Sequence, residues 1–504
     1  MHIIVASLGF PLWLRLAHYV NLLFVGLLIR SGIEILAAHP RLYWNDGCTP
    51  RTEWLKFTKR VVPTDPGVIY TARDDEIAIS PLLALPGNKN LGLGRHWHGV
   101  SNLCWMLNGT IYVVLLFTTG EWARLIPTSW SIVPGAWHSL ATYLSFQIPP
   151  LSEFRPYDPL QQLTYAFVVF VLGPFMLLTG VAMSPAIAAS APWYLRLFGG
   201  RQVARSLHFL GMATFAVFTV LHVALVLVVH FRENIGNIVL GAPDGNFPLA
   251  VGIAAVALLL VLAVYVWTAW YSLGHKRRVQ VALDRIEAPL RTLVLHNLAS
   301  AQHYPPSAIS PYFWINGAPP ETEDSPEFAA LRANDFREWR LEVGGLVKRP
   351  LHLSLDELHA LPTQTQITEH NCVQGWSAVG KWEGVNLAAL LARCEPLPGA
   401  RYVKFTSYGL DQFTYGGKPR RPFYEVIDLL LATHPQTILA YAFNDAPLPL
   451  PHGAPLRLRV ETQLGYKMVK YLRTIELVAD YQDSGEGQGG SREDTMFYGR
   501  GAEI

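Results

Sequence analysis

The 504-residue sequence predicts a multidomain protein in which an all-α transmembrane bundle of about five spans precedes a mixed α+β soluble domain. Long apolar runs occur only before about residue 275, and the rest of the chain has the charge density of an ordinary globular domain. A bilayer is spanned by about 20 apolar residues in a helix. The predicted units are a membrane domain (1–275), a connector (276–311), a soluble domain (312–481) and a flexible, Gly/Ser-rich tail (482–504).

Five apolar segments support the predicted bundle. Hydropathy places them at Leu12–Ile29, Leu103–Phe117, Leu163–Met183, Leu207–Val229 and Leu249–Tyr271. The second segment is short, and we expect its helix to begin earlier, near His98. Residues 30–97 contain several prolines and are too long for a simple turn, so they predict a small extramembrane insert.

The distribution of cations predicts the orientation of the bundle. Five spans place the two termini on opposite sides, and the loops on the C-terminal side hold most of the Lys and Arg, including the run 276–278. The positive-inside rule then places the soluble domain in the cytoplasm, with the bundle in a bacterial inner membrane. We expect no cleavable signal peptide or twin-arginine signal. No basic-aromatic array suggests a nucleic-acid partner.

The second half combines short strands with short helices. We expect a basic helical stretch from 276 to about Ser300, and then a Pro-rich linker before the soluble domain. Alternating apolar residues predict strands at Trp339–Val343, Tyr402–Ser407 and Leu456–Val460. Helical periodicity predicts helices at Leu355–Ala360, Leu387–Arg393 and Tyr424–Ala432.

Two histidines, His208 and His222, lie fourteen residues apart in the fourth apolar segment. That spacing advances about 21 Å along a helix and returns to nearly the same face. Following the chain through the spans places His98 level with His208 and His18 level with His222. Ionisable residues inside a membrane are costly and neutral imidazole binds iron, so the sequence predicts two bis-histidine haem sites.

Two alternatives remain open for these histidines. They could merely hydrogen-bond neighbouring helices, although four histidines at matched depths make that interpretation less favourable. His96 also competes with His98, which we prefer because it lies deeper in its span.

Residues 10–275 resemble the two-haem b-type cytochrome subunits of formate dehydrogenases, nickel–iron hydrogenases and thiosulfate reductases. The resemblance is carried by His18, the Arg95-His96-Trp97-His98 entry, Asn108-Gly109 and the His208/His222 pair. It implies that these histidines ligate two b haems and that a quinone or quinol is handled near one of them.

Cys372 lies in a polar, Gly-containing segment, Glu369–Ser377. A lone cysteine is more often a small buried hydrophobe, and Cys394 in a Leu-rich stretch fits that interpretation. The charged and imidazole neighbours of Cys372 instead favour thiolate, the form that binds metal. Downstream, residues 456–472 add Arg and Lys side chains around a glycine turn, and these residue types suit phosphate.

Residues 312–480 resemble the molybdopterin-binding domain of the sulfite oxidase family, in particular the methionine-sulfoxide reductase type. The matching pieces are Pro311–Gly317, Trp339–Val347, the Cys372 segment with Trp376 and Trp382, and His452–Arg457. The resemblance implies Cys372 as the catalytic centre and molybdenum ligand. It assigns the pterin and its phosphate to Asn316, Ser407, His452, Arg457, Met468, Val469 and Lys470.

The chain also departs from the pattern of that family. His452 stands where the reductases usually have asparagine before Gly-Ala-Pro. Val373–Trp376 replaces the arginine-rich stretch that follows the cysteine in sulfite oxidases, which weakens a sulfite pocket. We expect no second dimerisation domain.

Together these features predict a membrane-bound, molybdopterin-dependent oxidoreductase. It would couple the quinone/quinol pool to oxygen-atom transfer at molybdenum through two b haems, with a small-molecule or sulfoxide-type substrate reduced at the S-oxide or N-oxide. The alternative is an electron-transfer or docking cytochrome b whose molybdopterin-like domain has no turnover. A polar mouth beside Cys372 would favour the enzyme, and an aromatic plug such as Trp376 would favour the alternative.

Overall fold

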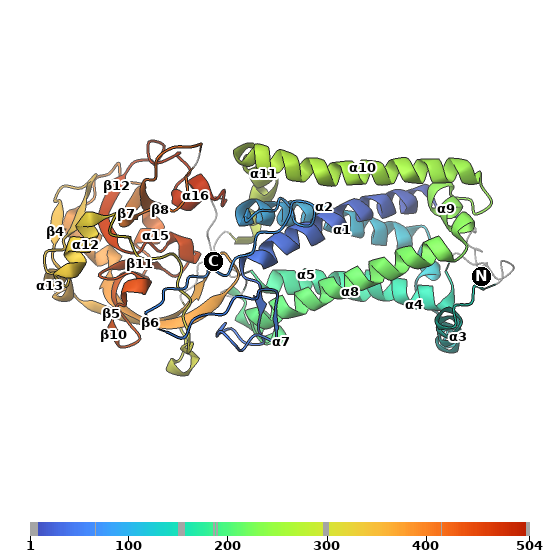
Figure 1. Cartoon of the computed structure of the whole chain (residues 1–504), viewed down its shortest axis with the longest axis horizontal. Helices are drawn as coiled ribbons and strands as arrows, with labels where there is room; N and C mark the ends of the chain where they lie inside the picture. Colours follow the sequence, from blue (N-terminus) through green and yellow to red (C-terminus); the bar gives the residue numbers. More distant parts are fainter. Residues whose placement is uncertain are drawn as a thin grey trace.

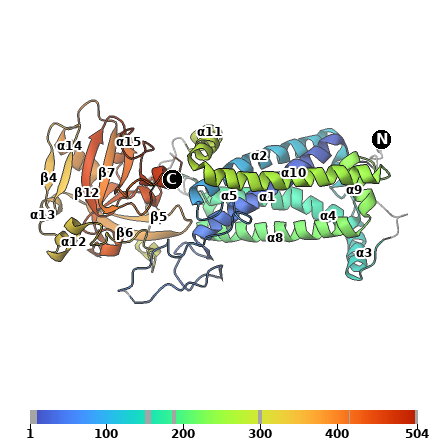
Figure 2. The same ribbon diagram turned by 45° about the horizontal axis from the view of Figure 1, so that its top comes forward.

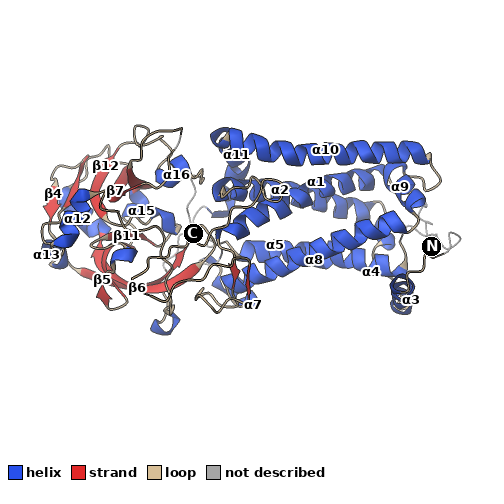
Figure 3. Cartoon of the chain, viewed as in Figure 1, coloured by secondary structure: helices blue, strands red, loops and turns tan. Residues whose placement is uncertain are grey.

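A bundle of long helices forms one half of the molecule and a two-sheet domain forms the other (Figure 1). The long helices lie in one half, and the two five-stranded sheets lie in the other half together with several short helices (Figure 3). This computed structural model therefore confirms the predicted fold class and the order of its two parts. It describes residues 9–65, 67–149, 157–184, 187, 190–295, 302–414 and 416–499.

Five helices of the described chain are long and apolar enough to cross a membrane, as predicted. They are α1 (Leu12–Ala38), α2 (Leu91–Thr118), the composite Pro159–Ala182, α8 (Arg201–Val228) and α10 (Phe247–Gly274). Most extend beyond their predicted segments, because hydropathy detects only the apolar part of a helix and misses its polar ends.

The composite third span contains a break in its α-helical hydrogen bonding. It consists of α4 (Pro159–Phe167), a π-helical turn (Val168–Leu172) and α5 (Gly173–Ala182). The side chain of Asp158 starts α4 by accepting a hydrogen bond from the backbone N–H of Gln161. Such a cap satisfies one of the N–H groups that a helix leaves unpaired at its first turn.

Shorter helices mark the two ends of the bundle. α7 (Pro192–Phe198) and α11 (Lys276–Leu295) lie at the end next to the sheets, whereas α3 (Ile132–Leu144) and α9 (Phe231–Leu240) lie at the opposite end (Figure 1). The predicted extension of the connector helix to Ser300 lies outside the described residues.

The insert between α1 and α2 packs between the bundle and the sheets (Figure 2). Its strands β1 (Arg41–Leu42) and β2 (Leu55–Lys56) pair antiparallel. The buried Arg41 pairs with Asp75 at 2.7 Å and with Glu53 at 2.6 Å, which fixes the fold of the insert. Both flanking helices continue into the predicted 30–97 range, because α1 ends only at Ala38 and α2 already begins at Leu91.

The soluble domain contains two five-stranded sheets with a shared apolar core. All strand pairs are antiparallel except β12 with β3. The first sheet comprises β5 (Thr363–Asn371), β6 (Ser377–Asn386), β9 (Thr437–Phe443), β10 (Ala446–Pro447) and β11 (Arg457–Val460). The second comprises β3 (Leu341–Gly345), β4 (Leu351–Leu353), β7 (Tyr402–Leu410), β8 (Pro422–Asp428) and β12 (Leu472–Val478).

Four short helices pack beside these sheets, and they include a correction to one of the predicted helices. They are α12 (Pro326–Ala333), α13 (Leu355–His359), α14 (Leu387–Cys394) and α15 (Leu429–Ala432). The predicted helix Tyr424–Ala432 is instead the strand β8 followed by the single turn α15. Residues 424–427 are all buried and pair with β7, and Asp428 then caps α15.

The tail that the sequence predicts to be flexible is folded over residues 482–499. It contains α16 (Ser491–Thr495), and the side chains of Phe497 and Tyr498 are buried. The guanidinium of Arg277 in α11 donates 2.8 Å hydrogen bonds to the backbone carbonyls of Glu493 and Asp494. The tail therefore joins the soluble domain to the end of the bundle.

Candidate functional site

Cys372 lies in a tight turn that joins β5 to β6. The backbone N–H of Cys372 donates to Trp376, and the N–H of Gly375 donates back to Cys372, both at 3.0 Å. Gly375 has a φ of +107°, where a side chain would be strained. The turn holds the thiol in the interior, where Cys372 is 1% exposed.

The sequence predicts that the neighbours of Cys372 favour its deprotonated form, and the structure shows a different environment. Burial raises the pKa of Cys372 to about 12, so the prediction that its surroundings favour the thiolate is wrong for the thiol by itself. A metal ion would displace the proton, because only the thiolate is a metal ligand. The Asn316 amide nitrogen lies 3.9 Å from Cys372 Sγ, which brings two predicted site residues together.

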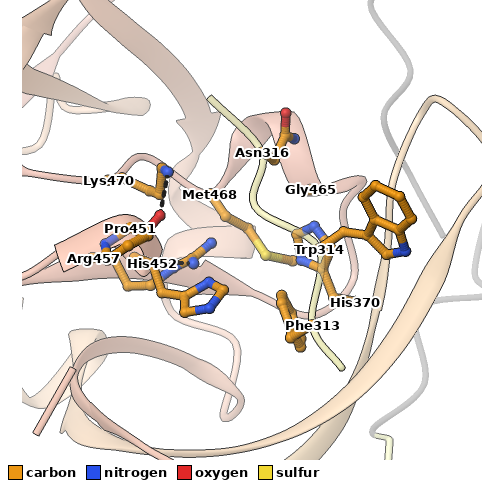
Figure 4. Close-up of a pocket in the computed structure, with 10 residues that line it drawn as sticks. All are labelled: Phe313, Trp314, Asn316, His370, Pro451, His452, Arg457, Gly465, Met468 and Lys470. Carbon is orange, nitrogen blue, oxygen red and sulfur yellow. Dashed lines mark hydrogen bonds between the residues drawn. The ribbon is translucent and has the colours of Figure 1, made fainter. Parts of the chain in front are cut away.

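A small pocket lies next to Asn316, and Cys372 is not among the described residues that line it (Figure 4). Five predicted site residues line it: Asn316, His452, Arg457, Met468 and Lys470. Its other lining residues are Phe313, Trp314, His370, Pro451 and Gly465. Trp376 does not line the pocket, since it is fully buried and stacks on His370 with ring centroids 5.2 Å apart.

The pocket concentrates positive charge. Arg457 and Lys470 have no carboxylate partner among the described ion pairs, and Arg457 Nε is buried without a hydrogen-bond partner. Burial and the neighbouring Arg459 lower the pKa of Arg457 to about 9, and burial together with Arg457 lowers the pKa of Lys470. Buried cations of this kind need an anion. The residues therefore fit the phosphate of a pterin cofactor.

Two predicted site residues, Ser407 and Val469, do not line the pocket but contact the chain next to it. The Ser407 hydroxyl donates a 2.8 Å hydrogen bond to the backbone carbonyl of Lys470. Val469 is fully buried, and its carbonyl accepts a 2.8 Å hydrogen bond from Leu458 N–H. Both residues contact the segment before β12 that carries Lys470, and neither is among the described residues that line the pocket.

His370 and Gly465 are site residues that the sequence reasoning missed. His370 Nδ1 lies 2.9 Å from an Arg459 guanidinium nitrogen. A Cβ on Gly465 would lie 2.2 Å from the His370 ring, so only glycine fits there. The signal that could have found His370 was its place two residues before Cys372, at the end of the strand β5.

The four predicted haem ligands form two pairs in the bundle. The ring centroids of His98 and His208 are 6.4 Å apart, and those of His18 and His222 are 6.2 Å apart. Two imidazole–metal bonds of about 2 Å and two ring radii of about 1 Å together give a separation of about 6 Å. Each pair therefore has the spacing that one metal ion between two imidazoles requires.

Hydroxyl groups lie 3.0 Å from Nδ1 of three of these rings, and the one at His222 belongs to Tyr165. Ser31 Oγ donates to the Leu27 carbonyl, so it accepts from His98 Nδ1 at 3.0 Å. Thr179 Oγ1 donates to the Phe175 carbonyl and likewise accepts from His208 Nδ1 at 3.0 Å. Both rings then present an unprotonated Nε2, the tautomer that ligates a metal.

The pair His98/His208 lines a cavity that is otherwise mostly apolar. His96, the competing candidate, instead lies 3.0 Å from a Glu287 carboxylate oxygen on α11. The structure therefore supports His98 over His96 as the member of this pair.

The end of the bundle that holds His98 and His208 contacts the Cys372 turn directly. Gln202 Nε2 donates to the Gly375 carbonyl at 2.9 Å, and Arg201 hydrogen-bonds to the Asn371 amide oxygen. Arg95 donates to the Val373 carbonyl at 3.3 Å. Arg95 is three residues from His98, and Gln202 is six from His208, which is about 9 Å along a helix. The two candidate metal sites are thus adjacent.

Comparison with known families assigns both parts of the chain. Residues 9–241 match the family model "Prokaryotic cytochrome b561", and residues 329–485 match "Oxidoreductase molybdopterin binding domain". The chain joins a cytochrome b561 domain to a molybdopterin-binding domain. The predicted resemblance and the predicted class, a membrane oxidoreductase with haem b and molybdopterin, are confirmed at the level of these families.

Several curated proteins resemble parts of this cytochrome b561–molybdopterin chain. A putative protein-methionine-sulfoxide reductase subunit YedZ1 of Azospira oryzae is 37% identical over 35% of this chain and 61% of its own length. The protein-methionine-sulfoxide reductase catalytic subunit MsrP of Xanthomonas axonopodis pv. citri is 36% identical over 31% of this chain and 50% of its own length. MsrP of Xanthomonas campestris pv. campestris is 35% identical over the same shares. The chain thus matches only about half to three-fifths of these relatives.

Part of the chain is also similar to a solved structure. The sulfane dehydrogenase SoxCD from Paracoccus pantotrophus is 21% identical over 31% of this chain and 40% of its own chain, with a TM-score of 0.25.

Proposed function

We propose that this protein is a membrane-bound molybdenum oxidoreductase that takes electrons from quinol and reduces an S-oxide or N-oxide through two b haems. In balanced form, a sulfoxide and a quinol give a sulfide, a quinone and water. The names of the curated relatives favour a sulfoxide substrate. The opposite direction, oxidation of a small anion with electrons passing to quinone, uses the same groups.

The observation that carries this proposal is the contact between the bundle and the Cys372 turn. Gln202 and Arg201 bind the turn from the helix that also carries His208 and His222. Joining both sites in one chain replaces a bimolecular encounter by an intramolecular one. A domain that served only for docking would not require its buried cysteine at this contact.

Each group of residues has a defined role in this proposal. The four histidines would hold two b haems, which supply one-electron carriers on the two sides of the bilayer. Cys372 would ligate molybdenum, which supplies a two-electron centre for oxygen-atom transfer. Arg457 and Lys470 would bind the phosphate of the pterin, and Asn316, beside Cys372 Sγ, would also contact the pterin.

The experiment is elemental and optical analysis of the purified full-length protein in detergent. We expect about one molybdenum and two b haems per chain, in line with one buried thiol and two histidine pairs. Cys372→Ala should lose the molybdenum EPR signal and substrate reduction, whereas Cys394→Ala, which removes a buried thiol of α14, should keep both. His208→Ala should lose one haem, and His138→Ala in α3 should keep both.

Other results would contradict this proposal in distinguishable ways. Haem without molybdenum in the wild type would favour the alternative, a docking cytochrome without turnover. Protein that contains neither cofactor would exclude both functions.

We also propose that the bundle lies in a bacterial inner membrane with the molybdopterin domain in the cytoplasm. The excess of Lys and Arg in the loops on the C-terminal side supports this orientation. Protease added to sealed inside-out vesicles should then digest the soluble domain, and protease added to right-side-out vesicles should leave it intact. The reverse pattern would place this domain outside the cytoplasm.

A further inference from the structure

The cavity that contains His98 and His208 has one charged position. Most of its lining comes from apolar side chains such as Leu28, Ile29 and Phe209. Apart from the two histidines, Arg205 is the only ionisable side chain among the described residues that line it. A cofactor in this cavity therefore meets a single permanent positive charge.

The guanidinium of Arg205 has no acidic partner. Its Nη1 donates to the Arg41 carbonyl at 2.8 Å, and its Nη2 donates to the His39 carbonyl at 2.6 Å. None of the ion pairs in the described parts of the chain includes Arg205. Carbonyl groups orient a guanidinium but do not neutralise it, and an uncompensated charge away from water is costly. An anionic group in the cavity would remove that cost.

Arg205 also lies between the two candidate cofactor sites. It precedes His208 by three residues, so both side chains project from the same side of α8. On its other side, a Cβ built on Gly375 would lie 3.5 Å from the guanidinium carbon. The guanidinium therefore contacts the Cys372 turn while it lines the histidine cavity.

We propose that Arg205 binds a propionate carboxylate of the haem held by His98 and His208. This inference rests on the proposed function, because it requires a b haem in this cavity. The arginine fork matches the geometry of a carboxylate, and haem b carries two carboxylates on one edge. The contact directs that edge of the haem toward Gly375 and Cys372. It also stabilises the reduced haem, because a cation nearby favours the added electron.

The test is a spectroelectrochemical redox titration of the b haems in the full-length protein. We expect Arg205→Gln to lower the midpoint potential of one haem and leave the other unchanged. The shifted component should be absent when His208→Ala is added and present when His222→Ala is added. Arg196→Gln serves as the control, because Arg196 is an exposed cation near the same end of the bundle. Unchanged midpoint potentials in Arg205→Gln would overturn the proposal.

A second variant decides the question if Arg205→Gln does not accumulate. With Arg205→His, burial keeps the pKa of the imidazole below its ordinary value of about 6.5, so the side chain is neutral at pH 7.5 and the cation is lost. The midpoint potential of the same haem should then be lower than in the wild type at pH 7.5. An unchanged midpoint potential would overturn the proposal. A different result, the absence of b-haem absorbance in the wild type, would contradict the proposed function itself.

Discussion

The side-chain amide of Gln202 donates a 2.9 Å hydrogen bond to the backbone carbonyl of Gly375. The same amide nitrogen lies 3.2 Å from the Ser377 hydroxyl, and Gln202 is 1% exposed. One helix, α8, therefore holds the cysteine turn at its first residues and carries His208 two turns later. The separation of the two sites is fixed by a rigid element and not by a flexible linker.

Gln202→Glu should slow electron transfer between the bundle and the Cys372 site. The substitution removes the donor and places a carboxylate against a carbonyl, and a buried unsatisfied group costs about 1–3 kcal/mol. We expect slower reoxidation of reduced haem on addition of sulfoxide in stopped-flow experiments, with unchanged haem and molybdenum contents. Gln162→Glu is the matched control, since Gln162 donates to the Ala123 carbonyl at the far end of the bundle. Equal rates in the two variants would contradict a role for the Gln202 contact.

Thr179→Val should weaken the haem site of His208. Thr179 Oγ1 accepts from His208 Nδ1 at 3.0 Å, and valine keeps the shape of the side chain without the acceptor. Loss of such a partner reduces metal affinity by about 10–100-fold. We expect a lower haem content or faster haem loss to apomyoglobin. Thr214→Val, which removes a threonine hydroxyl elsewhere on α8, should behave as the wild type.

The histidine pairs were predictable because helix geometry and span order are local properties of the sequence. A fourteen-residue spacing fixes the face and the separation, and counting spans then matches each histidine with a partner at the same depth. Ser31 and Thr179 were not predictable in this way. They are common residues of apolar helices, and only the packing of α1 against α2 and of α5 against α8 brings their hydroxyls to the rings.

The interface between the two domains could not be predicted from one sequence. The Arg201–Asn371 contact joins residues 170 positions apart, and the periodicity of apolar residues cannot predict a contact between such distant positions. The tail was mispredicted for a related reason. Its Gly- and Ser-rich composition indicates disorder, whereas its order comes from the buried charges of Glu493 and Asp494 and from tertiary contacts of Phe497. Likewise, the polar residues that flank Cys372 in the sequence did not predict that its side chain is buried.

Lys467→Met should destabilise the soluble domain and release the tail. Lys467 Nζ lies 2.9 Å from Glu425 and also pairs with Glu493 in α16, and all three side chains are buried. Removal of one partner from a buried ion pair costs about 3–5 kcal/mol. We expect a lower melting temperature and proteolytic cleavage within residues 482–499. Lys348→Met should change neither, because the Lys348 side chain is 63% exposed and its partner Glu395 lies at the surface.

His39→Phe should make the protein less sensitive to acid. His39 is fully buried, both of its ring nitrogens lack hydrogen-bond partners, and its ring stacks on Tyr43 with centroids 5.9 Å apart. Burial, with the cations Arg205 and Arg41, lowers the pKa of His39 well below 6.5. Below about pH 6.5 the unfolded chain therefore binds a proton that the folded chain does not, and stability falls by up to about 1.4 kcal/mol per pH unit.

Phenylalanine cannot take up that proton, and it can stack in the same place. We expect the melting temperature of His39→Phe to exceed that of the wild type at pH 7.5, because two unsatisfied nitrogens are removed. The difference should then widen as the pH is lowered from 6.5 to about 5, since only the wild type carries the linked proton. The exposed His352 provides the control, and His352→Phe should follow the pH dependence of the wild type. A constant difference between His39→Phe and the wild type across this range would show that His39 does not contribute to acid sensitivity.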